Sequence, residues 1–204
     1  VAAMQLHAYQ IAMRTRFRGI TTREGLLVHG SAGWGEFSPF LDYDGDEIRP
    51  WAQAAVEAAE TGLPAPLRDR IPVNVTVPAV DAEAAWKIAS SSHCRTAKVK
   101  VAEPGQTLSD DLDRVEAVRD ALGSDGRVRI DANGGWDVPS ALDNLRQLGR
   151  FGLEYAEQPC RTVEELAELR RTLAHHHIDV LIAADESIRR SGDPERVKEL
   201  DAAD

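Results

Sequence analysis

The sequence has few cysteines and no long apolar run. Its 204 residues include two cysteines, Cys94 and Cys160, which are too few for a disulfide framework and indicate a reducing cytoplasm. No stretch reaches the roughly 18 consecutive apolar residues of a membrane-spanning helix. Residues 1–10 lack the charged start and long apolar core of a signal peptide, so we expect a cytoplasmic protein.

Basic residues are outnumbered. The chain has 24 lysines and arginines against 34 aspartates and glutamates, which gives a net charge of −10. An acidic surface repels phosphate groups, so we expect neither nucleic acid nor an anionic membrane as a partner. The composition, with 43% hydrophobic and 28% charged residues, is typical of a globular protein.

The first 70 residues predict a small α+β domain. A glycine-rich turn at residues 30–33 is typical of a hairpin. A helix with an imperfect apolar stripe is expected at Asp46–Thr61. The expected strands are Gln5–Met13, Gly25–Gly30 and Gly33–Phe37.

Residues 71–204 alternate between apolar, β-branched runs and helical patterns. Thr162 with Glu165 three residues later has capping-box spacing, and Pro139 suits a first helical turn. Alternation of this kind predicts a parallel sheet covered by helices, as an open doubly wound sheet or a (β/α) barrel. The expected strands are Pro72–Val77, Thr96–Val101, Arg127–Asp131, Leu153–Glu157 and Val180–Asp185. The expected helices are Ala82–Ser91, Asp110–Leu122, Val138–Leu148 and Thr162–Ala174.

Four consecutive strands carry ionisable residues at or near their carboxyl ends, where parallel α/β folds hold their active sites. Lys98 and Lys100 are two apart and share one strand face. Mutual repulsion and burial would lower the pKa of such lysines toward that of a base. Asp131, Glu157 and Asp185 lie about one βα unit apart, and such carboxylates suit Mg²⁺.

Each of these signals alone has an ordinary structural explanation. A Lys-x-Lys pair is commonly a solvated strand face, and an aspartate after a strand is commonly the N-cap of the next helix. Glu157 before Gln158 and Pro159 could be part of a turn. Five ionisable groups at successive strand ends are hard to explain in this way, so we interpret them together as one functional site.

The chain resembles the enolase superfamily, in its muconate-lactonising subgroup. The matching segments are Lys98-Val99-Lys100, Asp131-Ala132-Asn133-Gly134-Gly135-Trp136, Glu157-Gln158-Pro159 and Asp185-Glu186-Ser187. The segment Trp34–Pro39 is similar to the end of the capping-domain sheet of those enzymes. The resemblance implies an N-terminal α+β capping domain, here residues 1–70, followed by a (β/α)7β TIM-like barrel, here residues 71–204.

The resemblance also implies the chemistry. Asp131, Glu157 and Asp185 would be the Mg²⁺ ligands, Lys100 the proton-transfer residue and Lys98 its electrostatic neighbour. The reaction would remove a proton α to a carboxylate and give an enediolate. A divalent cation stabilises the charge of that intermediate.

Among members of this superfamily, the chain is most similar to the bacterial o-succinylbenzoate synthases of menaquinone synthesis, which are lyases. Glu157-Gln158-Pro159-Cys160 and a short capping region carry this likeness. The segment Arg14–Ile20 resembles their mobile substrate-covering loop, and its charge suits a small dianionic carboxylate. We therefore expect Arg16 and Asn133 to contact the substrate; the same segment could also be a plain solvated loop. The oligomeric state is left open.

Several alternatives follow from the same resemblance. N-acylamino acid racemisation, dipeptide epimerisation and muconate cycloisomerisation share the superfamily's residues, and a non-catalytic metal-binding barrel fragment would keep only the carboxylates. A second lysine is expected one βα unit after Asp185, beyond Asp204. Lys198 is not expected to replace it, because Pro194–Leu200 predicts a surface helix. We therefore expect a barrel truncated after about five strands.

Overall fold

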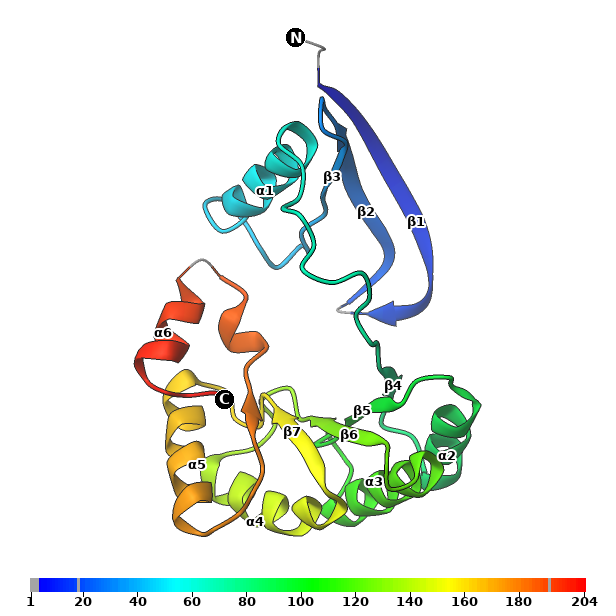
Figure 1. Cartoon of the computed structure of the whole chain (residues 1–204), viewed down its shortest axis with the longest axis vertical. Coiled ribbons are helices and arrows are strands. Elements are labelled where there is room, and N and C mark those ends of the chain that lie inside the picture. The colour runs from blue at the N-terminus through cyan, green and yellow to red at the C-terminus, as the bar shows by residue number, and fades with distance from the viewer. Residues whose placement is uncertain (1–3, 18, 191) are drawn as a thin grey trace. The chain divides into compact units, whose positions relative to one another are not determined.

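The computed structural model describes residues 4–17, 19–190 and 192–204 of the chain. They form two compact units, Val1–Asp69 and Arg70–Asp204, which Figure 1 shows in blue to cyan and in green to red. None of the helices in the described residues is long and apolar enough to cross a membrane.

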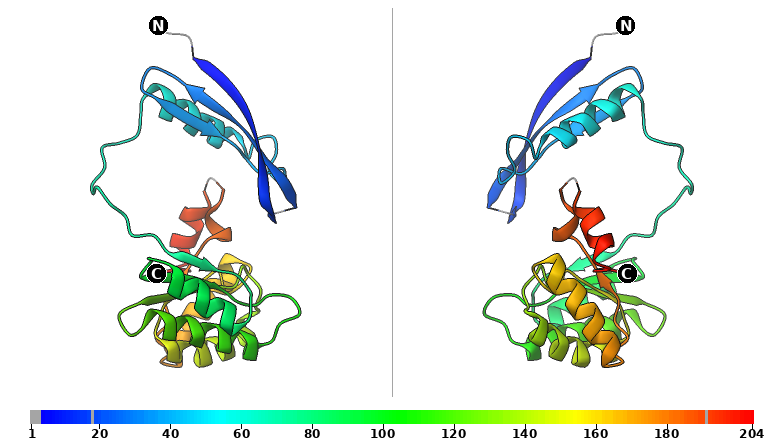
Figure 2. Two further views of the ribbon diagram at one scale, coloured as in Figure 1. Left: turned by 90° about the vertical axis from the view of Figure 1, so that its right-hand side faces the viewer. Right: turned by 90° about the vertical axis from the view of Figure 1, so that its left-hand side faces the viewer.

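The N-terminal unit is a three-stranded antiparallel sheet with one helix. Its order is β1-β2-β3, and α1 lies across one face of the sheet (Figure 2). The glycine-rich turn joins β2 to β3, and Gly30 N donates to Gly33 O over 2.9 Å, so the predicted hairpin is confirmed. The elements are β1 (Gln5–Phe17), β2 (Ile20–His29), β3 (Trp34–Phe37) and α1 (Arg49–Glu60).

Close packing of α1 on β3 requires a glycine. A Cβ on Gly35 would lie 1.9 Å from the Ala55 carbonyl oxygen, so any side chain there would push the helix off the sheet. Ala55 and Ala59 of the helix form a buried cluster with Val28 of β2. The prediction of an α+β unit is therefore confirmed, with small side chains at the contact.

The first hairpin is longer than predicted. β1 continues to Phe17, which pairs with Ile20, and the register shifts between Ala12 and Phe17. The segment around Arg16 is therefore strand and hairpin end, not a separate loop. The side chain of Arg16 lies outside the described residues.

The C-terminal unit is a parallel sheet with helices along one side of its strands (Figure 1). Its strands follow the order β4-β5-β6-β7-β8, which is the order of the sequence. The strands are β4 (Val75–Val77), β5 (Thr96–Lys100), β6 (Arg127–Asp131), β7 (Leu153–Glu157) and β8 (Ile182–Ala183). The helices are α2 (Ala82–Ser91), α3 (Leu108–Leu122), α4 (Val138–Leu148), α5 (Val163–His175) and α6 (Asp193–Glu199), with 3-10 turns η1 (Gly149–Phe151) and η2 (Glu186–Ile188).

Sequential strand order decides between the two predicted architectures. A doubly wound sheet reverses its strand order at a switch point, whereas a barrel adds each strand beside the last. The observed order is that of a barrel wall. Alternate strand residues such as Ala97, Val99 and Ile130 are fully buried in the core cluster between the strands and the helices. The intervening residues therefore face the other side of the sheet.

Side-chain caps fix the starts of α2, α3, α4 and α5. Thr162 caps α5 with a reciprocal capping box to Glu165, as the spacing predicts, and Thr107 caps α3 with Asp110 in the same way. Pro139 occupies the first turn of α4, as expected. Such caps satisfy backbone N–H groups that have no partner inside the helix.

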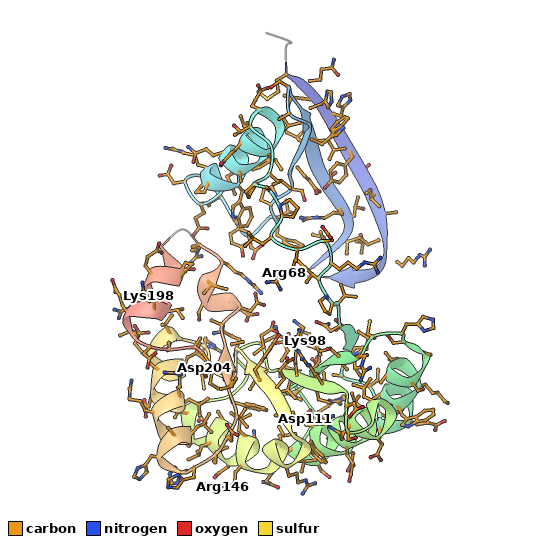
Figure 3. All side chains as sticks on the ribbon, viewed as in Figure 1. Arg68, Lys98, Asp111, Arg146, Lys198 and Asp204 are labelled. Carbon is orange, nitrogen blue, oxygen red and sulfur yellow. The ribbon has the colours of Figure 1, made fainter. Side chains whose placement is uncertain are left out.

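The last strand is shorter than predicted. β8 comprises two residues, and Asp185 lies beyond it as the residue before η2. Asp204 hydrogen-bonds to the backbone of Ile182 in β8. Its N donates to Ile182 O over 2.9 Å, and its carboxylate accepts from Ile182 N over 2.9 Å. Lys198 is exposed on α6, as predicted (Figure 3).

Candidate active site

Two lysines of β5 face away from the helices. Lys98 and Lys100 alternate with the fully buried Ala97 and Val99, so both ammonium groups project from the other face of the sheet. Register places Lys100 opposite Asp131 at the carboxyl end of β6. The predicted shared face of the two lysines is therefore observed.

The first two predicted carboxylates lie side by side at this end of the sheet. Asp131 pairs in register with Glu157 of β7, and Asp131 is fully buried. Lys98 Nζ bridges them, at 3.0 Å from Asp131 Oδ2 and 2.8 Å from Glu157 Oε1. Lys100 Nζ lies 2.6 Å from the same Asp131 oxygen. Four charged groups from three strands thus form one cluster.

The charges in this cluster stabilise one another. Burial lowers the pKa of Lys98, but its hydrogen bonds to Glu157 and Asp131 outweigh burial, so the net pKa is raised. The prediction that repulsion and burial lower the pKa is therefore wrong for Lys98, because two carboxylates lie within hydrogen-bonding distance of its Nζ. Burial raises the pKa of Asp131, yet hydrogen bonds from Lys100 and Lys98 bring it below its ordinary value. Burial keeps the pKa of Glu157 raised despite Lys98.

Asp185 follows the neighbouring strand but makes a different contact. Its Oδ2 pairs with Arg189 over 2.8 Å, and its backbone N donates to the side chain of Gln158 over 2.9 Å. Among the described residues, no three acidic, histidine or cysteine side chains gather closely enough to hold a metal ion. The structure thus joins Asp131 and Glu157, while Arg189 holds Asp185.

Asn133 contacts the lysine cluster directly. Its Oδ1 accepts from Lys100 Nζ over 2.7 Å, and its Nδ2 donates to Glu186 Oε1 over 3.0 Å. The residue has φ +47°, in the left-handed region that asparagine tolerates. Asn133 therefore connects the loop after β6 both to Lys100 and to the loop after β8.

Glu186 is a member of this site that sequence reasoning did not select. Its Oε1 accepts from Arg189 over 3.0 Å, whereas its buried Oε2 has no hydrogen-bond partner in the part of the chain that the structure describes. A buried oxygen without a partner is costly and calls for a ligand or an ordered water. The signal was available, since Glu186 stands next to Asp185 in the Asp-Glu-Ser segment.

Arg129 and Tyr155 lie on the same faces of β6 and β7 as Asp131 and Glu157, one alternation earlier, and were also missed. The Arg129 guanidinium lies 4.9 Å from the centre of the Tyr155 ring and pairs with Glu154 over 2.6 Å. Burial raises the pKa of Tyr155. These side chains extend the polar cluster along the strands toward their amino ends.

The chemistry of these oxygen donors fits a divalent cation. Asp131 and Glu157 already share one cation, the Lys98 ammonium, at hydrogen-bonding distance. Asp185 is also paired with a cation, and Glu186 supplies a buried oxygen without a partner among the described residues. Hard carboxylate oxygens of this kind are the ligands that Mg²⁺ prefers.

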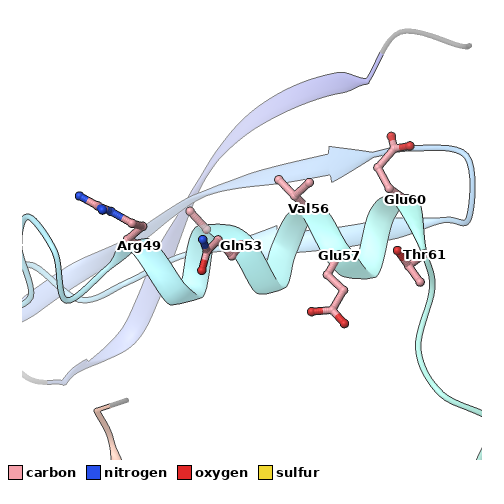
Figure 4. A pocket seen from close by; sticks show the side chains of 7 residues that line it. Arg49, Gln53, Val56, Glu57, Glu60 and Thr61 are labelled. Carbon is pink, nitrogen blue, oxygen red and sulfur yellow. The ribbon is translucent and has the colours of Figure 1, made fainter. Parts of the chain in front are cut away.

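A hollow of about 600 Å³ lies along α1 of the N-terminal unit, where Arg49, Gln53, Val56, Glu57 and Glu60 line it (Figure 4). These side chains include neither the lysine pair nor the strand-end carboxylates. The lining of the hollow therefore contributes none of the residues of the candidate active site.

Comparisons with known proteins give the family. The model of the enolase C-terminal domain-like family matches residues 80–204, which is more than half of the chain. The chain belongs to this family. The model of the enolase N-terminal domain-like family matches residues 8–59, in the other unit. The family and the α/β fold expected from the sequence are therefore confirmed.

Similar curated proteins of this family carry one name. An o-succinylbenzoate synthase of Thermobifida fusca (strain YX) is 62% identical over 197 residues, which are 97% of this chain and 61% of that protein. One from Mycolicibacterium smegmatis is 54% identical over 202 residues, 98% of this chain and 60% of that protein. The chain thus spans about 60% of the length of these relatives.

Solved structures share the fold. The o-succinylbenzoate synthase from Thermosynechococcus elongatus BP-1, complexed with Mg in the active site, aligns with a TM-score of 0.70 and 20% identity over 98% of this chain and 73% of that one. The L-Ala-D/L-Glu epimerase from Bacillus subtilis aligns with a TM-score of 0.76 and 24% identity over 99% and 72%. At these identities the likeness concerns the fold.

Proposed function

We propose that this enolase-like chain carries the metal-binding and proton-transfer residues of an o-succinylbenzoate synthase. The reaction is the Mg²⁺-dependent loss of water from a succinyl-hydroxycyclohexadiene carboxylate, in the cytoplasm, for menaquinone synthesis. The name shared by the relatives of high identity supports this substrate. The observation that carries the chemistry is the bridge of Lys98 between Asp131 and Glu157, with Lys100 beside it.

Asp131, Glu157 and Asp185 would hold the Mg²⁺ ion. When bound, the ion would stabilise the negative charge that develops on the substrate carboxylate. With Asp131 and Glu157 engaged in this way, Lys100 would lose its ion pair with Asp131. For Asp185 to join the set, its carboxylate would have to leave Arg189, with which it pairs over 2.8 Å.

The proton moves through Lys100. Neutral Nζ takes the proton α to the carboxylate, and the same ammonium returns it as the C–O bond breaks, so the hydroxyl leaves as water. Asn133 orients Nζ through its 2.7 Å hydrogen bond, and Lys98 keeps positive charge near the reacting carboxylate. We propose Arg16, with its charge, as a contact for the second carboxylate of the substrate.

The test follows the ultraviolet absorbance of the cyclohexadiene substrate. Purified protein should remove this absorbance with Mg²⁺ present, and EDTA should stop the loss. Lys100→Ala should lower turnover by at least the roughly 100- to 10,000-fold that a general base contributes, and it should still bind Mg²⁺. The matched control is Lys87→Ala on α2, where the lysine pairs with exposed Glu83.

Two results would contradict the proposal. Turnover that persists in Lys100→Ala would remove Lys100 from the proton-transfer role. A folded protein that binds Mg²⁺ but leaves the cyclohexadiene unchanged would instead direct the assay to N-acylamino acids and dipeptides, the substrates of the alternative racemase and epimerase activities. No observation in the site favours those alternatives over the dehydration.

A further inference from the structure

Gln158 stands next to Glu157 but faces the other way. It directly follows β7, its side chain is fully buried, and it has φ +40°. A residue other than glycine in this region costs about 1–3 kcal/mol and persists where the surroundings fix it. The surroundings of Gln158 are the loops that carry other residues of the active site.

Both the oxygen and the nitrogen of the Gln158 side-chain amide form hydrogen bonds with the loop after β8. Oε1 accepts from the backbone N of Asp185 over 2.9 Å and from that of Ser187 over 3.2 Å. Nε2 donates to Ser187 Oγ over 2.7 Å and to Cys160 O over 3.0 Å. Four hydrogen bonds therefore saturate one buried side chain.

The Gln158 backbone adds a connection on each side. Its N donates to Ala183 O of β8 over 2.8 Å, and its carbonyl accepts from Gly134 N over 2.7 Å. Gly134 follows Asn133 in the loop after β6. Gln158 thus connects the loops after β6 and β8 to the end of β7.

The loop that carries Asp185 has little regular structure of its own. β8 has two residues, η2 is one 3-10 turn, and η2 has no side-chain cap of its own. The carboxylate of Asp185 pairs with Arg189, and a metal ion would have to replace that partner. The Gln158 amide therefore holds the backbone N–H of Asp185, while the Asp185 carbonyl accepts from Ile188 N over 3.1 Å within η2.

We propose that Gln158 is a positioning residue that fixes the Asp185 backbone so that its carboxylate can join Asp131 and Glu157 around a divalent cation. This inference rests on the proposed metal site. Groups that orient metal ligands without touching the metal typically change affinity about 10- to 100-fold when they are removed.

Gln158→Met tests this role, because methionine has nearly the same volume and none of the hydrogen bonds. We expect its affinity for Mg²⁺, measured by calorimetry on the purified protein, to fall about 10- to 100-fold. Ser187→Ala removes one Nε2 partner and leaves the bond to Asp185, so its loss should be smaller. Thr162→Ala weakens the cap of α5 without touching this loop and should leave the affinity unchanged.

The outcomes separate positioning from stability. Unchanged affinity in Gln158→Met, or an equal loss in Thr162→Ala, would overturn the proposal. If Gln158→Met does not fold, Gln158→Asn withdraws the amide by one methylene and should show the same loss. If the unaltered protein binds no Mg²⁺, the proposed function fails. Hydrogen exchange of the backbone amides of Asp185 and Ser187 then tests the positioning role separately. If Gln158 holds this backbone, both amides exchange faster in Gln158→Met than in the unaltered protein.

Discussion

Asp111 and Arg114 are charged residues inside the core at the start of α3. Arg114 is 1% exposed; its Nη1 donates to Asp111 Oδ1 over 2.7 Å and to Lys100 O over 3.0 Å. Asp111 Oδ2 accepts from the backbone N of Ala102 over 3.0 Å. The pair therefore holds the chain that leaves β5 directly after Lys100.

Asp111→Ala should lower the free energy of unfolding by about 3–5 kcal/mol, because it leaves the charge of the buried Arg114 guanidinium without its ion-pair partner. The measurement is urea denaturation followed by circular dichroism. Asp143→Ala is the matched control, since Asp143 and Arg146 have the same spacing on α4 but are exposed (Figure 3 labels Asp111 and Arg146). It should cost at most about 1 kcal/mol. Equal costs in the two variants would contradict a structural role for the buried pair.

The positions of single site residues were predictable, but their partners were not. Strand alternation placed Lys98 and Lys100 on one face, and strand ends placed Asp131 beside Glu157. The raised pKa of Lys98 depends on its distances to both carboxylates. The pairing of Asp185 with Arg189 depends on the η2 turn, and no apolar periodicity predicts a single 3-10 turn.

Among whole elements, α5 shows how a local motif determines a boundary. Thr162 Oγ1 accepts from Glu165 N over 3.2 Å, and the Glu165 carboxylate accepts from Thr162 N over 2.9 Å. Thr162→Ala should lower the free energy of unfolding by about 1 kcal/mol, as the loss of an N-cap commonly does. Urea denaturation measures this change.

Thr172→Ala is the control on the same helix. Thr172 is half-buried, and its hydroxyl donates to Glu168 O over 2.8 Å within the helix, where alanine is the better helix former. This variant should be neutral or slightly stabilised. A loss equal to that of Thr162→Ala would mean that the cap contributes nothing specific.

Element boundaries were predictable where caps and apolar patterns agree. Helices α2 and α4 and strands β6 and β7 have the bounds that the sequence predicts, since each lies between clear start and stop signals. The first hairpin extends further than predicted, up to the pair of Phe17 with Ile20, and the described side chains of its strand β1 are mostly exposed. A strand with mostly exposed side chains shows no alternation of apolar and polar residues from which its end could be predicted.

The pKa of Asp204 links the stability of the sheet edge at β8 to pH. Burial raises the pKa of Asp204, but hydrogen bonds from Arg170 and Ile182 outweigh burial and hold the pKa below its ordinary value. A lowered pKa in the folded state contributes stability above the unfolded value of about 4, and that stability is lost as pH falls through the folded pKa.

Asp204→Asn should therefore be less stable than the unaltered protein at pH 7, and the difference should shrink below about pH 4. Urea midpoints at several pH values measure it. Asp143→Asn, whose carboxylate is exposed, should show little difference at any pH. A difference for Asp204→Asn that stays constant down to low pH would mean that the substitution acts on stability for reasons other than the loss of charge.

At the scale of the whole molecule, the two units should respond differently to metal. All the proposed ligands belong to the unit Arg70–Asp204, and none belongs to Val1–Asp69. A ligand that binds only the folded state stabilises it, by about 2.7 kcal/mol at about 100 times its Kd. Mg²⁺ should therefore slow amide exchange in peptides that span β5 to η2.

Amide exchange in peptides of β1, β2 and α1 should not change when Mg²⁺ is added. EDTA should reverse the protection of the peptides that span β5 to η2. Hydrogen exchange read by mass spectrometry resolves the two units in one experiment. Asp131→Asn is the matched variant, because it keeps the size of a ligand side chain and removes its charge, so its β5-to-η2 peptides should gain no protection. Protection that spreads equally over both units, or that survives in Asp131→Asn, would place the bound ion away from the strand ends.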